Sequence, residues 1–152
     1  MNSPLDINRG APATAAGEQL IDADPDTVFS VISAIDEWPS WNPDVKSAVL
    51  EGPVEQGTVF RWKAGASSLT SQLEVVDPPS EIAWTGRTMG ITAIHIFRFE
   101  ARDGRTFASS EESWDGLLPR LLRGWSRRTL EKGIEDVLSH LKAESERRAA
   151  RP

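Results

Sequence analysis

The sequence predicts an α+β fold in which a curved, seven-stranded antiparallel sheet wraps around a long C-terminal helix, with two short helices after the first strand. Two observations predict it. Apolar side chains recur with a period of two over residues 45–114, and with a helical period from there to Leu141. The 152 residues fit a single domain, since domains commonly contain roughly 100 to 200 residues. We expect that domain to cover residues 16–147.

The N-terminal elements follow from local signals. Residues 1–15 are rich in Pro, Ala and Gly without an apolar period, which predicts a disordered leader. A short strand is expected over residues 16–21. Asp24 and Pro25 are a typical helix start, with Asp24 as the cap and Pro25 at the first helical position. The segment 38–43 has room for about one helical turn between its two prolines.

Six strands are expected in the central stretch, because turn signals divide it at residues 51–53, 63–68, 77–80, 86–90 and 103–104. Phe60 and Trp62 alternate with Arg61 and Lys63, which predicts one apolar and one solvated face. Asp103-Gly104 is typical of a two-residue hairpin, so Arg102 pairs with Arg105 and His95 lies opposite Glu112. Counting from the same turn gives the pairs Phe97–Ser110, Phe99–Ala108 and Ala93–Trp114. The same reasoning applied to the turn at residues 77–80 gives the pairs Val76–Glu81, Val75–Ile82 and Leu73–Trp84.

The C-terminal helix carries two apolar stripes. Leu130, Ile134 and Leu138 lie on one face, whereas Leu118, Leu121, Leu122 and Trp125 point about 130° away at 100° per residue. One straight helix cannot bury both stripes on one surface, so a break or kink is expected near residues 124–128. Residues 148–152 are predicted to be a disordered tail.

Six segments carry a resemblance to a known family, at residues 24–29, 38–44, 60–63, 77–79, 82–86 and 111–116. Over residues 16–145 the chain resembles the START-like, helix-grip superfamily (SRPBCC), and most closely its bacterial branch of polyketide cyclase/dehydrase-like proteins. The resemblance implies a cavity between the concave face and the long helix that takes a small hydrophobic ligand, lipids included. Residues 118–125 would then form a lid at the cavity mouth.

The concave face is predicted to supply the ligand-binding side chains, and the lid adds two more. They are Phe60, Trp62, Ser71, Leu73, Trp84, His95, Phe97, Phe99, Ser110, Glu112, Trp114, Leu121 and Trp125. Leu69, Val75, Ile82 and Ala93 are placed on the same face. Only His95 and Glu112 among all of these titrate, and two interpretations stay open for them. They are either a satisfied polar pair in the core or a pair that anchors a ligand or moves protons.

Composition excludes several function classes. The chain contains no Cys, and its two histidines have no partner at metal-ligand spacing, so no metal is expected. Phosphate loops, dinucleotide fingerprints and nucleophile elbows are missing, so we expect no cofactor. A net charge of −6 argues against nucleic acid as a partner. Without a signal peptide or an apolar run long enough to insert stably into a membrane, a cytoplasmic location is expected.

Charge is distributed unevenly along the chain. Residues 1–116 hold 8 basic and 18 acidic side chains, whereas residues 117–152 hold 9 basic and 5 acidic ones. The arginines at positions 120, 123, 127 and 128 belong to this basic part. They form either a solvated helix face or a docking surface.

Three functions follow as hypotheses. The first is binding of a small hydrophobic molecule, aromatic or polycyclic, between sheet and helix. The second, implied by the resemblance, is a polyketide cyclase or aromatase in which His95 and Glu112 transfer protons. The third is a chaperone-associated interaction module, suggested by relatives of this fold and by the basic last helix. A homodimer and a monomer are both compatible with the sequence.

Overall fold

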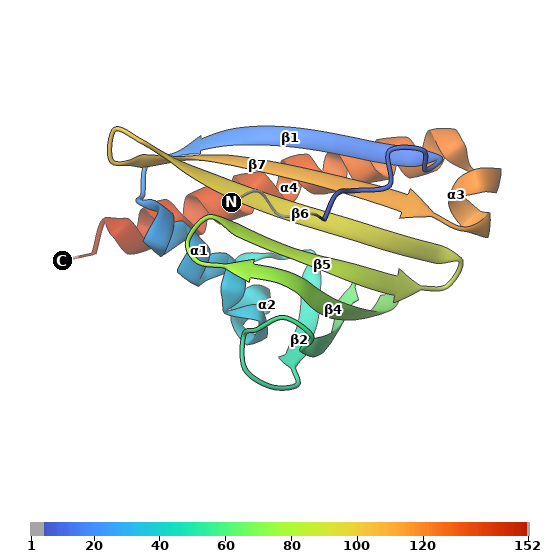
Figure 1. Ribbon diagram of the computed structural model, residues 1–152, viewed down its shortest axis with the longest axis horizontal. Helices are drawn as coiled ribbons and strands as arrows, with labels where there is room; N and C mark the ends of the chain where they lie inside the picture. Colours follow the sequence, from blue (N-terminus) through green and yellow to red (C-terminus); the bar gives the residue numbers. More distant parts are fainter. Residues whose placement is uncertain (1–4, 152) are drawn as a thin grey trace.

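The computed structural model describes residues 5–151 and contains one seven-stranded antiparallel sheet that curves around the long helix α4 (Figure 1). The strand order is β1-β7-β6-β5-β4-β3-β2, so β1 is the only strand placed out of chain order. This arrangement confirms the predicted fold class. The strands are β1 (Ala13–Ile21), β2 (Val45–Leu50), β3 (Val59–Ala64), β4 (Ser67–Asp77), β5 (Glu81–Thr88), β6 (Ile91–Arg102) and β7 (Arg105–Asp115).

Short helices connect β1 to β2. They are α1 (Pro25–Ser33), a 3-10 turn η1 (Ile35–Glu37) and α2 (Trp38–Trp41). The predicted cap of α1 is confirmed, because the Asp24 side chain accepts a hydrogen bond from the Thr27 backbone N–H at 2.8 Å and Pro25 occupies the first turn. Trp38 ties α2 to α1 by donating its indole N–H to the Ile32 carbonyl at 2.9 Å.

The main core lies between the concave face of the sheet, α1 and α4, and includes Phe60, Phe97 and Leu138. α4 (Arg123–Ala149) packs against β1 at Gly17. A Cβ atom at Gly17 would lie 2.9 Å from Ile134 Cγ2 and 3.1 Å from Leu138 Cδ1. The missing side chain therefore allows helix and strand to approach this closely.

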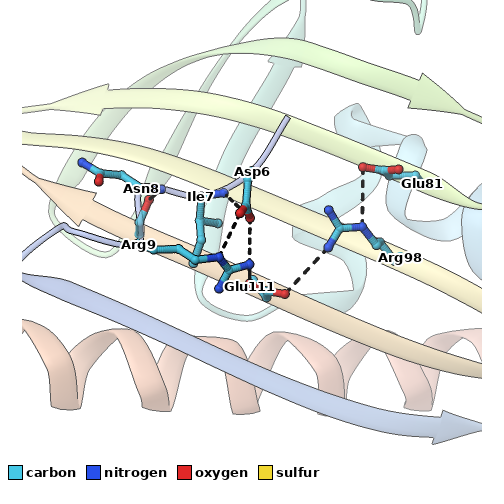
Figure 2. A network of polar contacts seen from close by, with 8 residues as sticks. Asp6, Ile7, Asn8, Arg9, Glu81, Arg98 and Glu111 are labelled. Atoms are coloured by element: carbon cyan, nitrogen blue, oxygen red, sulfur yellow. Dashed lines mark hydrogen bonds and ion pairs between the residues drawn. The ribbon is translucent and has the colours of Figure 1, made fainter. Parts of the chain in front are cut away.

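The N-terminal segment differs from the predicted disordered leader. Strand β1 begins at Ala13, and residues 5–12 lie across the outer face of the sheet (Figure 2). Ile7 is buried there against Ala83 and Ile96. The prediction was wrong because it treated the outer face as fully solvated, whereas Ala83, Ile94 and Ile96 form an apolar patch that the segment covers. Residues 1–4 of the predicted leader lie outside the described residues.

Polar contacts hold the same segment to β7. Arg9 forms ion pairs with Asp6 at 2.8 Å and with Glu111 at 2.9 Å. The Asn8 backbone N–H donates to Ser113 Oγ at 3.0 Å. Figure 2 shows these contacts extending through Arg98, which lies 3.7 Å from both Glu111 and Glu81. The segment therefore runs along the outer side of the strand that carries Glu112.

A β-bulge corrects the predicted pairing of β4 with β5. Leu73 lies opposite Trp84 as expected, but Val75 pairs with Ala83 and Val76 with Ile82, because the register shifts between Leu73 and Val75. The bulge reverses the alternation of faces. Val75 therefore packs with the outer apolar patch instead of the concave face, and Val76 takes the inner position.

The β6–β7 hairpin has the predicted register throughout. Arg102 pairs with Arg105 and His95 with Glu112, and the pairs of Phe97, Phe99 and Ala93 also agree. Asp103 and Gly104 both have positive φ, at 51° and 78°, which is the conformation that this two-residue turn requires.

The predicted break in the C-terminal helix occurs at Leu122, two residues before the expected range of 124–128. It separates α3 (Leu117–Leu121) from α4. The predicted disordered tail, residues 148–152, is corrected at its start, because α4 continues to Ala149, and residue 152 lies outside the described residues. Arg147 and Arg148 both bind Glu144, and such contacts between residues three and four apart support the last helical turn. Within residues 5–151, no helix is long and apolar enough to cross a membrane.

Candidate ligand-binding cavity

A cavity of about 960 Å³ lies between the concave face of the sheet, α2, α3 and the first half of α4. Its size is at the upper end of the range of roughly 300 to 1,000 Å³ that is usual for small-molecule sites. The chain contains six tryptophans, and all of them contribute to the wall. They are Trp38, Trp41, Trp62, Trp84, Trp114 and Trp125.

The structure divides the predicted ligand-binding residues into three groups. Seven line the cavity, namely Trp62, Ser71, Trp84, His95, Glu112, Trp114 and Trp125. Five are buried in the core beside it, namely Phe60, Leu73, Phe97, Phe99 and Ser110. Leu121 does neither, because its side chain is 71% exposed and points away from the cavity wall.

Helix α1 explains why part of the concave face is core. Phe99 lies farther along β6 than His95 and packs edge-to-face against Phe29 of α1, with 6.4 Å between ring centroids. The cavity therefore lies beyond the part of the sheet that α1 fills, and α1 contributes only Ile32 to its wall. Except at the bulge beside Val75, alternation identified the inward face correctly, but it contains no information on which part of that face a helix fills.

Two wall residues were missed as cavity residues at the sequence level. Trp38 and Trp41 are not among the predicted ligand-binding residues, yet both line the cavity. The Trp38 ring lies 5.4 Å from the Trp62 ring and 5.2 Å from the Trp84 ring, which makes a continuous aromatic surface. From α4, Leu130, Gly133 and Val137 complete the opposite wall. The density of tryptophan in segment 38–41 is the signal that could have identified them.

One polar cluster lies in this aromatic wall. His95 Nδ1 is 3.3 Å from Glu112 Oε1, and the Trp114 indole N–H donates to Glu112 Oε2 at 3.0 Å. On the other side of the ring, His95 Nε2 is 2.8 Å from Ser110 Oγ. The predicted His95–Glu112 pair is therefore present. Glu112, the cross-strand partner of His95, holds one ring nitrogen, and Ser110, the diagonal neighbour on β7, holds the other.

Burial governs the protonation of this pair. Desolvation lowers the pKa of His95 to about 3, because the low-dielectric wall disfavours the imidazolium. Desolvation also raises the pKa of Glu112 to about 7, and the hydrogen bond from Trp114 opposes this rise. Between about pH 3 and pH 7 the cluster therefore holds a neutral imidazole beside a protonated carboxyl group, with no net charge.

The chain Ser110–His95–Glu112 has the order of a serine hydrolase triad but not its accessibility. Ser110 is 1% exposed and does not line the cavity, so no substrate atom can approach its hydroxyl group. Its bond fixes the ring orientation of His95. Glu112 and His95 do line the cavity, and Glu112 can exchange a hydrogen bond or a proton with a bound molecule.

A second polar contact lies on the neighbouring strands. The Trp62 indole N–H donates to Ser71 Oγ at 3.0 Å, and both residues line the cavity. Within residues 5–151, no cluster of His, Asp and Glu side chains could hold a metal ion.

Sequence comparison identifies the family. A model of the family described as polyketide cyclase/dehydrase and lipid transport matches residues 12–146. The chain belongs to this family. The match covers all seven strands, α3 and nearly all of α4. The search of curated proteins found no match to this sequence.

Solved structures share the fold at low sequence identity. A hypothetical protein from Helicobacter pylori, jhp0584, has a TM-score of 0.81 at 16% identity, covering 95% of this chain and 99% of the other. The Zhui aromatase/cyclase from Streptomyces sp. R1128 has a TM-score of 0.74 at 18% identity, covering 89% and 94%. StfQ, the di-domain ARO/CYC of the steffimycin biosynthetic pathway, has a TM-score of 0.75 at 17% identity, covering 92% of this chain and 53% of its own.

Proposed function

We propose that this protein binds a small, mainly apolar molecule that carries at least one hydroxyl or carbonyl group. The observation that supports this function best is the combination of an aromatic cavity of about 960 Å³ with the buried polar cluster of His95 and Glu112 in its wall. Flat tryptophan surfaces favour aromatic or polycyclic ligands, because ring stacking adds to the burial of apolar area. Membership of the polyketide cyclase/dehydrase and lipid transport family is in keeping with such a ligand.

The polar cluster indicates what the ligand must offer. With its carboxyl protonated, Glu112 can donate a hydrogen bond to a ligand oxygen, and so can the Ser71 hydroxyl group, whereas His95 holds Glu112 in place. A hydrocarbon would leave the hydroxyl protons of Glu112 and Ser71 without an acceptor when it displaces water from the wall. We therefore expect discrimination between molecules of equal shape that differ by one oxygen.

A matched pair of probes tests this expectation. 2-Naphthol and naphthalene are titrated separately into the protein while tryptophan fluorescence is recorded. We expect 2-naphthol to bind at least about tenfold more tightly, which corresponds to one net hydrogen bond of about 1.4 kcal/mol. Glu112→Gln and His95→Phe should reduce this preference, whereas Glu100→Gln and His140→Phe, outside the cavity, should retain it. Absence of binding by both probes, and by a panel of larger polycyclic phenols and ketones, would overturn the proposal.

Proton-transfer catalysis is a second candidate function, as expected for an aromatase or cyclase. It is favoured by one observation, the rise in the pKa of Glu112 to about 7, since a general acid or base works best with a pKa near the working pH. In this mechanism Glu112 transfers the proton. Neutral His95, whose pKa is about 3, orients the carboxyl group and is too weak a base to act alone.

Kinetics separates binding from catalysis. If the protein catalyses cyclisation of a poly-ketone substrate, Glu112→Gln should lower kcat by roughly 100-fold or more while changing the dissociation constant of the product little. Equal turnover by Glu112→Gln and the wild type would reject Glu112 as the proton-transfer residue. Loss of affinity without any turnover in the wild type would favour binding alone.

A further inference from the structure

An exposed apolar patch surrounds the cavity mouth. Leu117 and Leu121 of α3 are 69% and 71% exposed, and Met89, at the tip of the β5–β6 hairpin, is 91% exposed. Leu122 and Trp125 add side chains that are 47% and 49% exposed. We call these five residues the mouth patch. They contain most of the large hydrophobic side chains that the described residues expose to this degree, so the patch is a local feature and not general surface composition.

Backbone contacts hold the two parts of the mouth patch together. The Leu118 N–H donates to the Gly90 carbonyl at 3.2 Å, which joins α3 to the hairpin tip. Gly116 makes this approach possible, because its φ is 119° and a Cβ atom there would clash with the Gly90 carbonyl. Figure 1 shows α3 and the β5–β6 turn projecting at the same end of the molecule. Leu118 and Met89 also line the cavity, so the patch borders its mouth.

The charged residues of segment 117–128 are all basic. Residues 117–128 contain Arg120, Arg123, Arg127 and Arg128 and no acidic residue, although the chain as a whole has a net charge of −6. Arg120 contacts Asp115 and Arg127 donates to the Pro12 carbonyl. The side chains of Arg123 and Arg128 make no hydrogen bond or ion pair within residues 5–151. Because salt screens charges beyond about 8 to 10 Å, a partner at this end meets the arginines and little of the acidic remainder.

We propose that the mouth patch docks on the surface of an anionic lipid bilayer. Leucine and methionine side chains on the projecting α3 and β5–β6 turn enter the acyl boundary, Trp125 lies at headgroup depth, and the arginines contact anionic headgroups. The projecting position (Figure 1) and the absence of acidic or amide side chains from residues 117–128 favour lipid over a protein partner, which would need complementary polar contacts. This proposal goes beyond the binding function and would place the cavity mouth at the membrane.

Vesicle co-sedimentation tests the docking. The protein is mixed with sucrose-loaded vesicles of phosphatidylcholine alone, or of phosphatidylcholine with 30% phosphatidylglycerol, at 0.05 and 0.5 M NaCl. We expect at least about tenfold stronger partitioning to the anionic vesicles at low salt, and most of the difference to vanish at high salt. Equal partitioning to both vesicles, or none, overturns the proposal.

Variants locate the surface. Arg123→Glu combined with Arg128→Glu should weaken partitioning by about thirtyfold or more, since each arginine near an anionic surface contributes roughly fivefold. The matched control, Arg102→Glu with Arg105→Glu, makes the same change in charge at the opposite end of β6 and should partition like the wild type. Leu121→Ser should also weaken partitioning, whereas Val49→Ser, which removes a 58% exposed side chain on β2, should not.

Two further measurements keep the outcomes distinct. Naphthol titration of Leu121→Ser tests the cavity independently, because Leu121 does not line it. Retained naphthol binding with unchanged vesicle partitioning overturns the docking proposal only. Sedimentation velocity of the protein alone tests self-association. If the wild type forms a dimer, Leu121→Ser dissociates it, and the wild type does not bind vesicles, then the patch is a contact between two copies and lipid docking is overturned.

Discussion

Replacement of Glu112 by Gln should make the protein more stable at alkaline pH. The folded carboxyl group has a pKa of about 7, raised from 4.5 by burial. Between these two pH values the folded protein keeps a proton that the unfolded chain has released. The stabilisation from this group is therefore fully present below pH 4.5 and is lost as the pH rises through 7. Glutamine has nearly the same shape and does not titrate, so Glu112→Gln escapes this loss.

The magnitude follows from the two pKa values. The difference between 4.5 and about 7 corresponds to about 3 kcal/mol, since each pKa unit is worth roughly 1.4 kcal/mol. The Glu112 side chain is 17% exposed, so solvent screening leaves this figure as an upper bound. His95 titrates in both proteins, and its contribution cancels to first order in the comparison. Relative to the wild type, the variant should gain between 1 and about 3 kcal/mol from pH 4.5 to pH 8.

Urea unfolding followed by far-ultraviolet circular dichroism measures this gain. Free energies of unfolding are determined for both proteins at pH 4.5 and pH 8. The slopes of these free energies against urea concentration are compared, because equal slopes show that the unfolded states are alike. Glu100→Gln is the control, because its side chain is 68% exposed on the same sheet. If Glu112→Gln changes stability equally at both pH values, burial does not control the carboxyl group. A variant that is selectively less stable at pH 8 would mean that Glu112 is held as an anion by an imidazolium, and would refute the reasoning.

Two further predictions concern the scaffold. Gly17→Ala should destabilise the protein by about 1 to 3 kcal/mol, because its new Cβ lies 2.9 Å from Ile134 Cγ2 and overpacks the β1–α4 contact. Thermal unfolding measures this loss of stability. The control is Gly133→Ala, which should not destabilise the protein because no atom lies within 4 Å of its new Cβ. Ile7→Ser should release residues 5–12 from the outer apolar patch, so that trypsin cleaves after Arg9 well before it cleaves elsewhere, as mass spectrometry would detect. Unchanged protection of that bond would mean that the polar contacts of Asn8 and Arg9 are enough to hold the segment.

The sequence allowed prediction of what depends on local rules. The Asp103-Gly104 turn has one preferred geometry, so counting from it placed His95 opposite Glu112 correctly. Asp24 and Pro25 likewise defined the start of α1. Each of these predictions needs only the residues next to a turn or a helix end, together with the two-residue period of a strand.

Predictions failed where two distant segments meet. The burial of Ile7 depends on Ala83 and Ile96, which lie far along the chain and were expected to face solvent. Leu121 was assigned to the cavity because its stripe is apolar, yet the break at Leu122 turns it outward. The bulge between Leu73 and Val75 contains no glycine or proline that would predict it from the sequence. In each case a tertiary contact decides whether the side chain is buried or exposed, or which face it takes. The local sequence pattern would be the same if the result were the opposite.

Strand β7 combines the outer and inner halves of this molecule. Glu111, Ser113 and Asp115 point outward and contact Arg9 and Asn8 of the N-terminal segment. The residues between them, Glu112 and Trp114, point inward and carry the polar cluster of the cavity. A single strand whose two faces are both bonded has little freedom to twist or slip in register. The N-terminal segment therefore braces the strand that must hold a carboxyl group in a desolvated wall, and Asp115 extends this support to the mouth by accepting hydrogen bonds from Gly116 and Arg120.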